Sequence, residues 1–233
     1  PGITTVLKGL AVCSKYLLAD PLRAPRRTGR FLQMLGHTIL AYDRAESCAK
    51  IPRQLLHTII PGVESTEVAL ADVSWRDGNV TMAELYCLCA IARLRTIRAA
   101  LEIGTFQGLV MANLARNTDA HTRLITVDLR PGDLAQLCRP LAPGELLYVN
   151  KPSIGEKIAR LPQALRDRVV QLYGDSSRLD FSPYYGQIDL VFIDGSHQYE
   201  YVAHDSEEAF RLRAPGGLVI WHDYLVWPDV TRH

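Results

Sequence analysis

The chain has 233 residues, of which 48% are hydrophobic and 22% charged, and its net charge is +1. This length and composition fit one sizeable α/β core, and the near-neutral charge argues against a general nucleic-acid binder. No apolar run approaches the ~20 residues of a membrane span, and no secretory signal is evident. The five cysteines form no metal-binding or disulfide pattern, so we expect a cytoplasmic protein.

Residues 1–60 differ from the rest of the chain in charge, with nine basic and three acidic residues, a net charge of +6. Two apolar stripes at helical spacing, in 7–18 and 31–40, flank a break that contains prolines and four arginines. We predict a helical N-terminal extension that serves as a cap or as the oligomerisation element of a homo-oligomer. The alternative is contact of the arginine cluster with a membrane surface or an acidic partner. No nucleic-acid-binding motif accompanies the cluster.

From residue 81 onward, helix and strand signals alternate. Thr81 and Glu84 form a capping box at the start of a helix that runs to about residue 95. A second capping box, from Ser153 to Glu156, predicts a helix that ends near residue 161. Pro215–Gly217 predicts a turn before the last strand. The remaining predicted elements are strands at 98–103, 124–128, 169–173, 188–193 and 218–221, and helices at 107–116 and 199–213.

This alternation predicts a doubly wound, mostly parallel α/β sheet with right-handed crossovers, in a domain of residues 61–233. Its most informative corner is the apolar run that stops at Gly104, followed by Gly108 and a helix. A strand, a glycine turn and a helix N-terminus form a ligand site in such sheets. The glycine spacing is not that of a dinucleotide fingerprint, so a nicotinamide-dependent oxidoreductase is disfavoured. The alternative is a strand-loop-helix connection that binds no ligand.

Acidic residues follow all five predicted strands. One acid after a strand is often only a helix cap or turn former. Five acids at one sheet edge, with two histidines, would repel one another unless a ligand or metal organised them. The acids and their neighbours are Glu102, Asp128, Asp175 with Ser176, Asp194 with His197, and His222 with Asp223.

The Glu-x-Gly-x-x-x-Gly run at 102–108 resembles motif I of class I S-adenosylmethionine-dependent methyltransferases. The Asp-Gly-Ser-His-Gln-Tyr-Glu run at 194–200 and His-Asp-Tyr at 222–224 resemble a bacterial small-molecule O-methyltransferase subgroup, related to sugar O-methyltransferases and cephalosporin hydroxylase-like proteins. The resemblance covers about 80–230. It implies a Rossmann-like fold and S-adenosylmethionine as the cofactor. The implied cofactor-binding residues are Glu102, Gly104, Thr105, Phe106, Gly108, Asp128, Asp175, Ser176 and Asp194.

Within this resemblance, Glu102 would anchor the cofactor's amino group, Asp128 its ribose hydroxyls, and Asp175 with Ser176 its adenine. Gly104 and Gly108 would let the backbone approach the cofactor.

The catalytic residues would be Asp194 and His197, with a neutral His197 imidazole as general base. The alternative for His197 is a structural bond to an acid. By analogy with metal-dependent O-methyltransferases, Asp194, His222 and Asp223 would hold a divalent metal. Magnesium prefers oxygen ligands and imidazole favours other metals, so His222 is alternatively a structural residue.

Location alone suggests Asp205, ahead of His204, for a secondary polar contact, and Tyr148, Lys151 and Gly155 for a loop that covers the substrate. The predicted function is methyl transfer to a hydroxyl of a small molecule of sugar or natural-product type. The alternative is a non-catalytic cofactor-binding or protein-interaction module. Class I methyltransferases usually have two more strands after the fifth. We therefore expect a chain truncated at its C-terminus, and its start at Pro1 also suggests a fragment.

Overall fold

A computed structural model describes residues 49–74, 78–139, 141, 145–149 and 153–233. The predicted helical extension therefore lies almost wholly outside the described residues. The helices are α3 (Leu56–Ile59), α4 (Met82–Leu94), α5 (Leu109–Asn117), α6 (Leu146–Val149), α7 (Glu156–Ala159), α8 (Gln163–Arg166), α9 (Tyr199–Leu212) and α10 (Pro228–Arg232), with short 3₁₀ turns at Val63–Ser65, Asp133–Gln136 and Ser182–Tyr184. The strands are β1 (Ala99–Ile103), β2 (Arg123–Asp128), β3 (Val169–Tyr173), β4 (Ile188–Ile193) and β5 (Arg213–Trp221).

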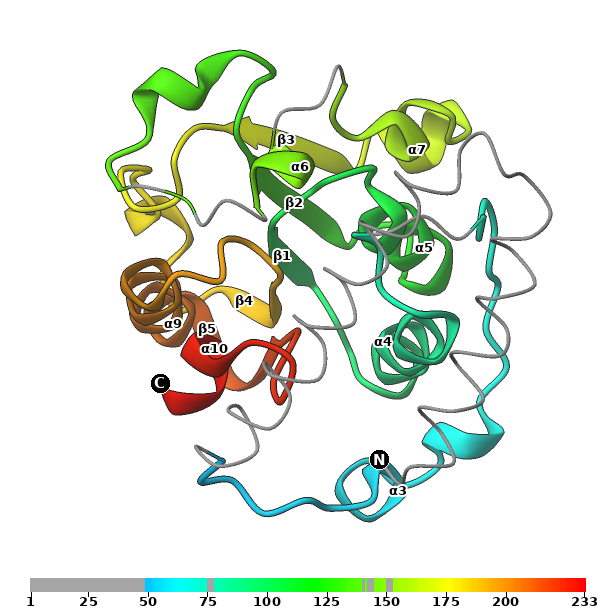
Figure 1. Ribbon diagram of the computed structural model, residues 1–233. Coiled ribbons are helices and arrows are strands. Elements are labelled where there is room, and N and C mark those ends of the chain that lie inside the picture. The colour runs from blue at the N-terminus through cyan, green and yellow to red at the C-terminus, as the bar shows by residue number, and fades with distance from the viewer. Residues whose placement is uncertain (1–48, 75–77, 140, 142–144, 150–152) are drawn as a thin grey trace, which may run out of the picture.

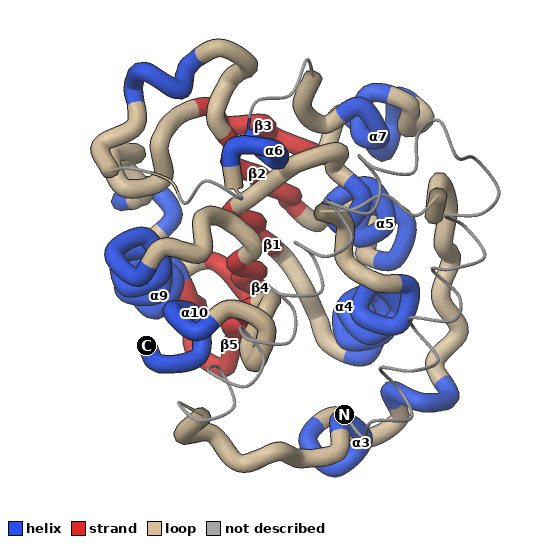
Figure 2. The backbone as a smooth tube through the Cα atoms, in the orientation of Figure 1, coloured by secondary structure: helices blue, strands red, loops and turns tan. Residues whose placement is uncertain are grey.

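The five strands form one parallel sheet in the order β3-β2-β1-β4-β5. Helices α4 and α5 cover one face, and α9 covers the other (Figures 1 and 2). Every residue of β1 and β4 is buried, as expected for central parallel strands covered on both faces. The predicted doubly wound, Rossmann-like architecture is confirmed. Within the described ranges, no helix is long and apolar enough to cross a membrane.

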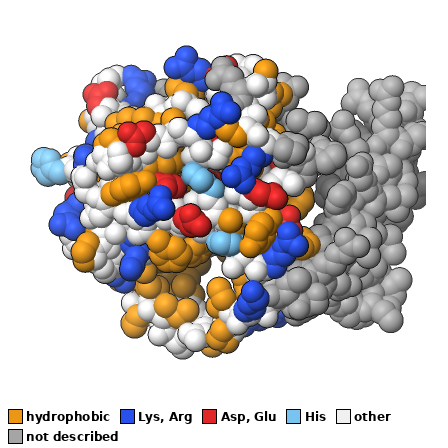
Figure 3. Space-filling view, turned by 90° about the vertical axis from the view of Figure 1, so that its left-hand side faces the viewer, with side chains coloured by type: hydrophobic (Ala, Val, Ile, Leu, Met, Phe, Trp, Pro, Cys, Tyr) orange, Lys and Arg blue, Asp and Glu red, His pale blue; other side chains and the backbone are white. Residues whose placement is uncertain are grey.

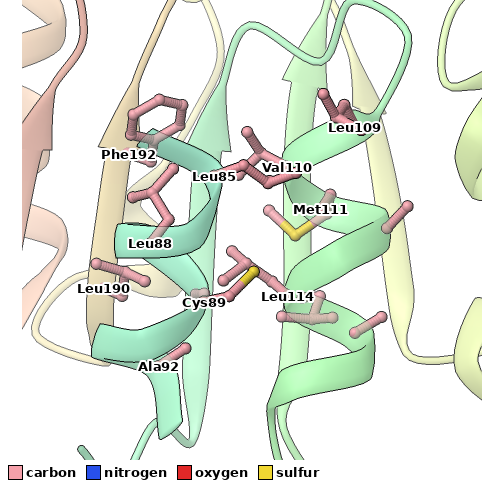
Figure 4. Packing of buried hydrophobic residues seen from close by; sticks show 14 of the residues in the cluster. Leu85, Leu88, Cys89, Ala92, Leu109, Val110, Met111, Leu114, Leu190 and Phe192 are labelled. Atoms are coloured by element: carbon pink, nitrogen blue, oxygen red, sulfur yellow. The ribbon is translucent and has the colours of Figure 1, made fainter. Parts of the chain in front are cut away.

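The larger core cluster lies between the sheet and the pair α4–α5. Leu85 of α4 lies beside Val110 of α5, and Leu88 lies close to Phe192 and Leu190 of β4 (Figure 4). These side chains are at most 5% exposed. Burying a side chain of this size contributes roughly 1.5–3 kcal/mol. This packing fixes the N-terminus of α4 and the loop before α5 at the carboxyl edge of the sheet.

The predicted capping box at the start of α4 is confirmed, because Thr81 Oγ1 accepts from Glu84 N and the Glu84 carboxylate accepts from Thr81 N at 2.6 Å. The predicted box at Ser153 is wrong. Helix α7 begins after Gly155, whose backbone is left-handed, and no side chain caps it. Gly155 N instead donates to Phe106 O at 2.9 Å, so a long-range backbone bond replaces the local cap.

The Pro215–Gly217 segment does not precede β5 but lies inside it. Pairing with β4 jumps from Ile188–Arg213 to Leu190–Leu218, so the intervening residues form an irregularity in the strand. A Cβ on Gly217 would lie 2.9 Å from Ile188 O, which shows how closely this irregular segment approaches β4. In the described structure β5 forms one edge of the sheet, and α10 follows it.

The segment before α4 is tied to α5 and α7. Backbone groups of 69–71 pair with the side-chain amides of Asn113 and Asn117, which lie one turn apart on α5. Lys157 of α7 is only 3% exposed, and its Nζ donates to Asp72 O at 2.7 Å and to Asp72 Oδ1 at 3.1 Å. These polar contacts hold the chain that leads into α4 against the body of the domain.

Candidate active site

The site lies where β1 and β4, neighbours at the centre of the sheet, send their connections in opposite directions. Such a switch point creates a crevice at the carboxyl ends of the strands. Gly104 N donates to Val127 O at 2.9 Å, and Asp194 N donates to Ile103 O at 2.8 Å. A Cβ on Gly104 would lie 2.0 Å from Asp194 O. The loops after β1 and β4 are therefore in direct backbone contact.

The loop after β1 has a strained backbone. Phe106 has φ of +46°, a backbone conformation that residues other than glycine rarely adopt. Its N–H donates to Asp128 Oδ2 at 2.8 Å, which brings the end of β2 to the loop. A Cβ on Gly108 would lie 2.6 Å from Ile158 of α7. The space left by the missing side chains of Gly104 and Gly108 is thus occupied by other parts of the protein, Asp194 O and Ile158. The predicted approach of the two glycines to a cofactor stays a prediction.

A buried chain of hydrogen bonds lies beneath this loop. Gln171 donates to Thr105 at 2.9 Å, the Thr105 and Thr126 hydroxyls are 2.7 Å apart, and Thr126 donates to Glu102 at 2.6 Å. Because Thr126 has one proton and gives it to Glu102, Thr105 must donate to Thr126. Glu102 is 2% exposed, so its carboxylate supports the loop from inside the domain. Its predicted contact with the cofactor's amino group remains untested.

Asp175, which follows β3, is saturated by protein donors. Its Oδ2 accepts from Cys138 N and Tyr201 Oη, and its Oδ1 accepts from the Ser177 N–H and hydroxyl. Burial raises the pKa of this carboxyl, but the four donors outweigh burial and lower the pKa below its usual range. A carboxylate has about four acceptor positions. These four donors give Asp175 a structural role in the loop after β3, and its predicted hydrogen bond to adenine stays a prediction.

Asp205 of α9 lies under the loops that follow β3 and β4. Its side chain contacts Ser176, and Oδ2 would lie 3.5 Å from a Cβ on Gly195. The residue is 1% exposed, and Oδ2 has no hydrogen-bond partner among the described residues. Burial raises the pKa of this carboxyl, although contact with His204 opposes the change. Its predicted secondary polar role, and that of Ser176 toward a cofactor, stay predictions.

Asp194, His197 and Asp223 come together at the ends of β4 and β5. Their ligand atoms all lie within 4.8 Å of one another. His197 Nε2 is 2.7 Å from Asp223 Oδ2, and the ring stacks on Trp227 with centroids 4.7 Å apart. Asp223 has φ of +60°, so the backbone is strained where it presents this carboxylate. The space-filling view shows histidine and acidic side chains close together near the centre of one face (Figure 3).

The second ring nitrogen of His197 meets a third carboxylate. Its Nδ1 is 3.2 Å from Glu145 Oε1, which also accepts from the His197 backbone N–H. Burial favours the neutral ring, but Asp223 and Glu145 outweigh burial and raise the pKa of His197 to about 9. The two carboxylates therefore favour a protonated ring. The predicted role of His197 as general base stays a prediction.

His222 contacts both Asp194 and Asp223, and its Nδ1 is 3.2 Å from Asp223 Oδ2. Its Nδ1 is 3.0 Å from Asp194 Oδ1, and its Nε2 is 3.4 Å from Glu84 Oε2 at the start of α4. Burial opposes its charge, but these carboxylates and Asp223 raise the pKa of His222 to about 12. Burial raises the pKa of the Asp194 carboxyl above its usual range. The Asp223 carboxyl, contacted by both histidines, has a pKa below its usual range despite burial.

Among the described residues, Asp194, His197 and Asp223 form a group whose ligand atoms lie close enough together to hold a cation. His222 Nδ1 also contacts both Asp194 and Asp223, so the predicted metal set of Asp194, His222 and Asp223 stays a prediction beside the group that includes His197. One imidazole and two carboxylates form a donor set that suits a divalent transition metal, and its oxygens also suit magnesium. The described residues therefore fit a divalent cation.

Sequence reasoning missed Glu145, Trp227 and the second role of Glu84. Glu145 lies 52 positions from His197, in the long connection between β2 and β3, and no spacing rule links the two. Tyr148, predicted in a covering loop, packs edge-on against Phe106 with centroids 6.4 Å apart. Its neighbour Lys151 lies outside the described residues.

The sheet order defines a Rossmann-like domain, and the site lies at its β1/β4 switch point, where folds of this kind bind their ligands. A family model described as a methyltransferase domain matches residues 101–224, slightly more than half of the chain. The chain belongs to this methyltransferase domain family. The class I methyltransferase relationship expected from the sequence is confirmed.

Several solved structures are similar to the chain. Cofactor-bound Rv0187 from MTB is 24% identical, with a TM-score of 0.43 and coverage of 71% of this chain and 63% of that one. The O-methyltransferase TomG of Streptomyces achromogenes, solved with SAM, is 22% identical, with a TM-score of 0.44 and coverage of 73% and 66%. The Bacillus cereus O-methyltransferase, solved with SAH, is 22% identical, with a TM-score of 0.44 and coverage of 79% and 72%.

The chain thus spans less than two thirds of the length of the first two of these proteins. A comparison with curated proteins finds no matching relative.

Proposed function

We propose that the protein transfers a methyl group from S-adenosylmethionine to a hydroxyl of a small molecule of sugar or natural-product type. The observation that carries the proposal is the convergence of Gly104, Asp128 and Asp194 at one switch point, in a chain that belongs to a methyltransferase family. A cationic sulfonium donor suits this crevice, because acids follow β2, β4 and β5. Opposite charge in a partly buried site strengthens binding.

The acceptor hydroxyl would lie beside Asp194 for in-line transfer. His197 and Asp194 are the two residues proposed to accept the hydroxyl proton. Both ring nitrogens of His197 face carboxylates, which raise its basicity, and burial raises the pKa of the Asp194 carboxyl above its usual range. Most of the rate would come from holding the two reactants in line and excluding water.

A divalent cation, where used, would be held by Asp194, His197 and Asp223 and would lower the pKa of the acceptor hydroxyl. His222 and Glu84 would then hold Asp194 in position from the side of α4.

Calorimetry with S-adenosylmethionine and S-adenosylhomocysteine tests the cofactor. We expect binding by the wild-type protein and its loss in Asp128→Ala. Asp133→Ala serves as the matched control, because it removes an acid from the same connection, five residues further on. Undiminished binding by Asp128→Ala would remove the ribose assignment. Failure of the wild-type protein to bind either compound would refute the proposed function.

Mass spectrometry of candidate sugars and phenolic natural products incubated with the donor then tests the reaction. Binding of the donor without transfer to any hydroxyl would favour the non-catalytic alternative.

A further inference from the structure

The His197 ring is held from three directions by residues far apart in the sequence. Asp223, at the end of β5, contacts Nε2 at 2.7 Å, and Glu145, just before α6, contacts Nδ1 at 3.2 Å. Trp227 lies against the ring face, with an angle of 20° between the two planes. A 180° flip of the ring would keep the stacking but lose both polar contacts, so the two acids define the orientation of the two nitrogens.

Glu145 does more than neutralise a charge. The same Oε1 atom accepts from the His197 backbone N–H and from Ser196 Oγ at 3.1 Å. The residue is 3% exposed, and a buried carboxylate is stable only when donors surround it. These donors all come from the loop after β4, so the carboxylate fixes that loop and the ring together.

We infer that Glu145 is a positioning residue that keeps a proton on His197 Nδ1 and thereby directs the Nε2 lone pair toward Asp194 and Asp223 when a divalent cation binds. A carboxylate on the far nitrogen of a metal-binding histidine fixes its tautomer and raises its basicity. The inference rests on the cation-binding part of the proposed function. It assigns a role to the connection between β2 and β3, whose sequence carries no motif for this site.

Of the acids in the cluster, only Glu145 contacts Nδ1 in the described contacts. Asp223 faces Nε2, and Glu84 contacts the other histidine, His222. Binding of a cation at Nε2 would displace the proton shared with Asp223 to solvent. The other proton would remain on His197 Nδ1, hydrogen-bonded to Glu145, so among the described acids Glu145 is the one that can act through the ring.

Calorimetric titration with Mn²⁺ alone tests the inference on wild-type protein, Glu145→Gln and Glu145→Ala. We expect 10–100-fold weaker Mn²⁺ binding in Glu145→Ala, the range that loss of such a partner typically produces. Glu145→Gln keeps an acceptor oxygen without the charge and should lie between the other two. Glu200→Gln is the matched control, an exposed glutamate three residues after His197, and should bind Mn²⁺ as the wild type does.

A second readout separates positioning from mere structural support. The ¹⁵N spectrum of the Zn²⁺-loaded wild type should show the His197 proton on Nδ1, and Glu145→Gln should show that signal weakened or redistributed. Urea unfolding shows whether each variant folds. If Glu145→Ala does not fold, Glu145→Gln, which preserves the shape of the side chain, tests the inference alone.

Equal Mn²⁺ affinity in all variants, or an unchanged ring spectrum, would overturn the inference. Failure of wild-type protein to bind Mn²⁺ would also overturn it, yet would leave the S-adenosylmethionine test of the proposed function unaffected.

Discussion

Gly104→Ala is the perturbation that most directly tests the backbone contact on which the site depends. Gly104 has φ of +102°, and an added Cβ would lie 2.0 Å from Asp194 O. Gly132 has φ of +91°, with nothing within 4 Å of an added Cβ, so Gly132→Ala is a control for backbone strain alone. Each alanine should cost about 1–2 kcal/mol for the unfavourable φ. Overpacking at Gly104 should add about 1–3 kcal/mol.

Urea denaturation followed by circular dichroism measures the difference between the two variants. With a dependence of about 2 kcal/mol per molar urea, an additional 2 kcal/mol lowers the midpoint by about 1 M. Gly104→Ala should also weaken donor binding, because the displaced Asp194 loop forms one wall of the crevice. Equal midpoints for Gly104→Ala and Gly132→Ala would refute the reasoning, since only the former has a steric contact to relieve.

Three further predictions concern the polar contacts around the site. Lys157→Met keeps the packing but removes the hydrogen bonds to Asp72, which retains Arg160 as a partner, so the free energy of unfolding should fall by about 0.5–1.5 kcal/mol in urea denaturation. The folded pKa of His197, about 9, exceeds its ordinary value of 6.5, so its stabilising contribution is complete below pH 6.5 and lost as pH rises to 9. In metal-free protein this loss is at most about 3 kcal/mol, and a His197→Gln variant that shows the same fall between pH 6.5 and 9 would contradict the assignment. Glu84→Gln preserves the capping box but removes the charge that faces His222. We expect kcat to fall while the free energy of unfolding changes by less than about 0.5 kcal/mol. A large loss of stability with unchanged kcat would show that Glu84 acts only as part of the cap.

Much of the domain could be predicted from the sequence because its signals are local. The capping box at Thr81 and Glu84 acts within one helical turn, and β3 and β4 begin and end at the predicted residues. Their apolar runs report burial directly, since central parallel strands must bury both faces. The acids that follow the strands likewise predict Asp194 and Asp223 at one edge of the sheet.

Local signals failed where long-range contacts compete with them. The Ser153 cap does not form, because backbone donors near Gly155 bind the loop after β1 instead. Pro215–Gly217 was predicted as a turn, yet pairing with β4 continues on both sides of it.

The sequence by itself determined the alternation of strands and helices, the glycine corner and the set of acids at the carboxyl edge. Only the tertiary structure showed that His197 joins the acid pair that His222 also contacts, and that Glu145 lies at the far nitrogen of His197. The physical reason is that a side chain's partner depends on which segments pack together, and contacts across 52 positions leave no periodic trace in the chain. Charge state follows from those partners, so it too became visible only in three dimensions.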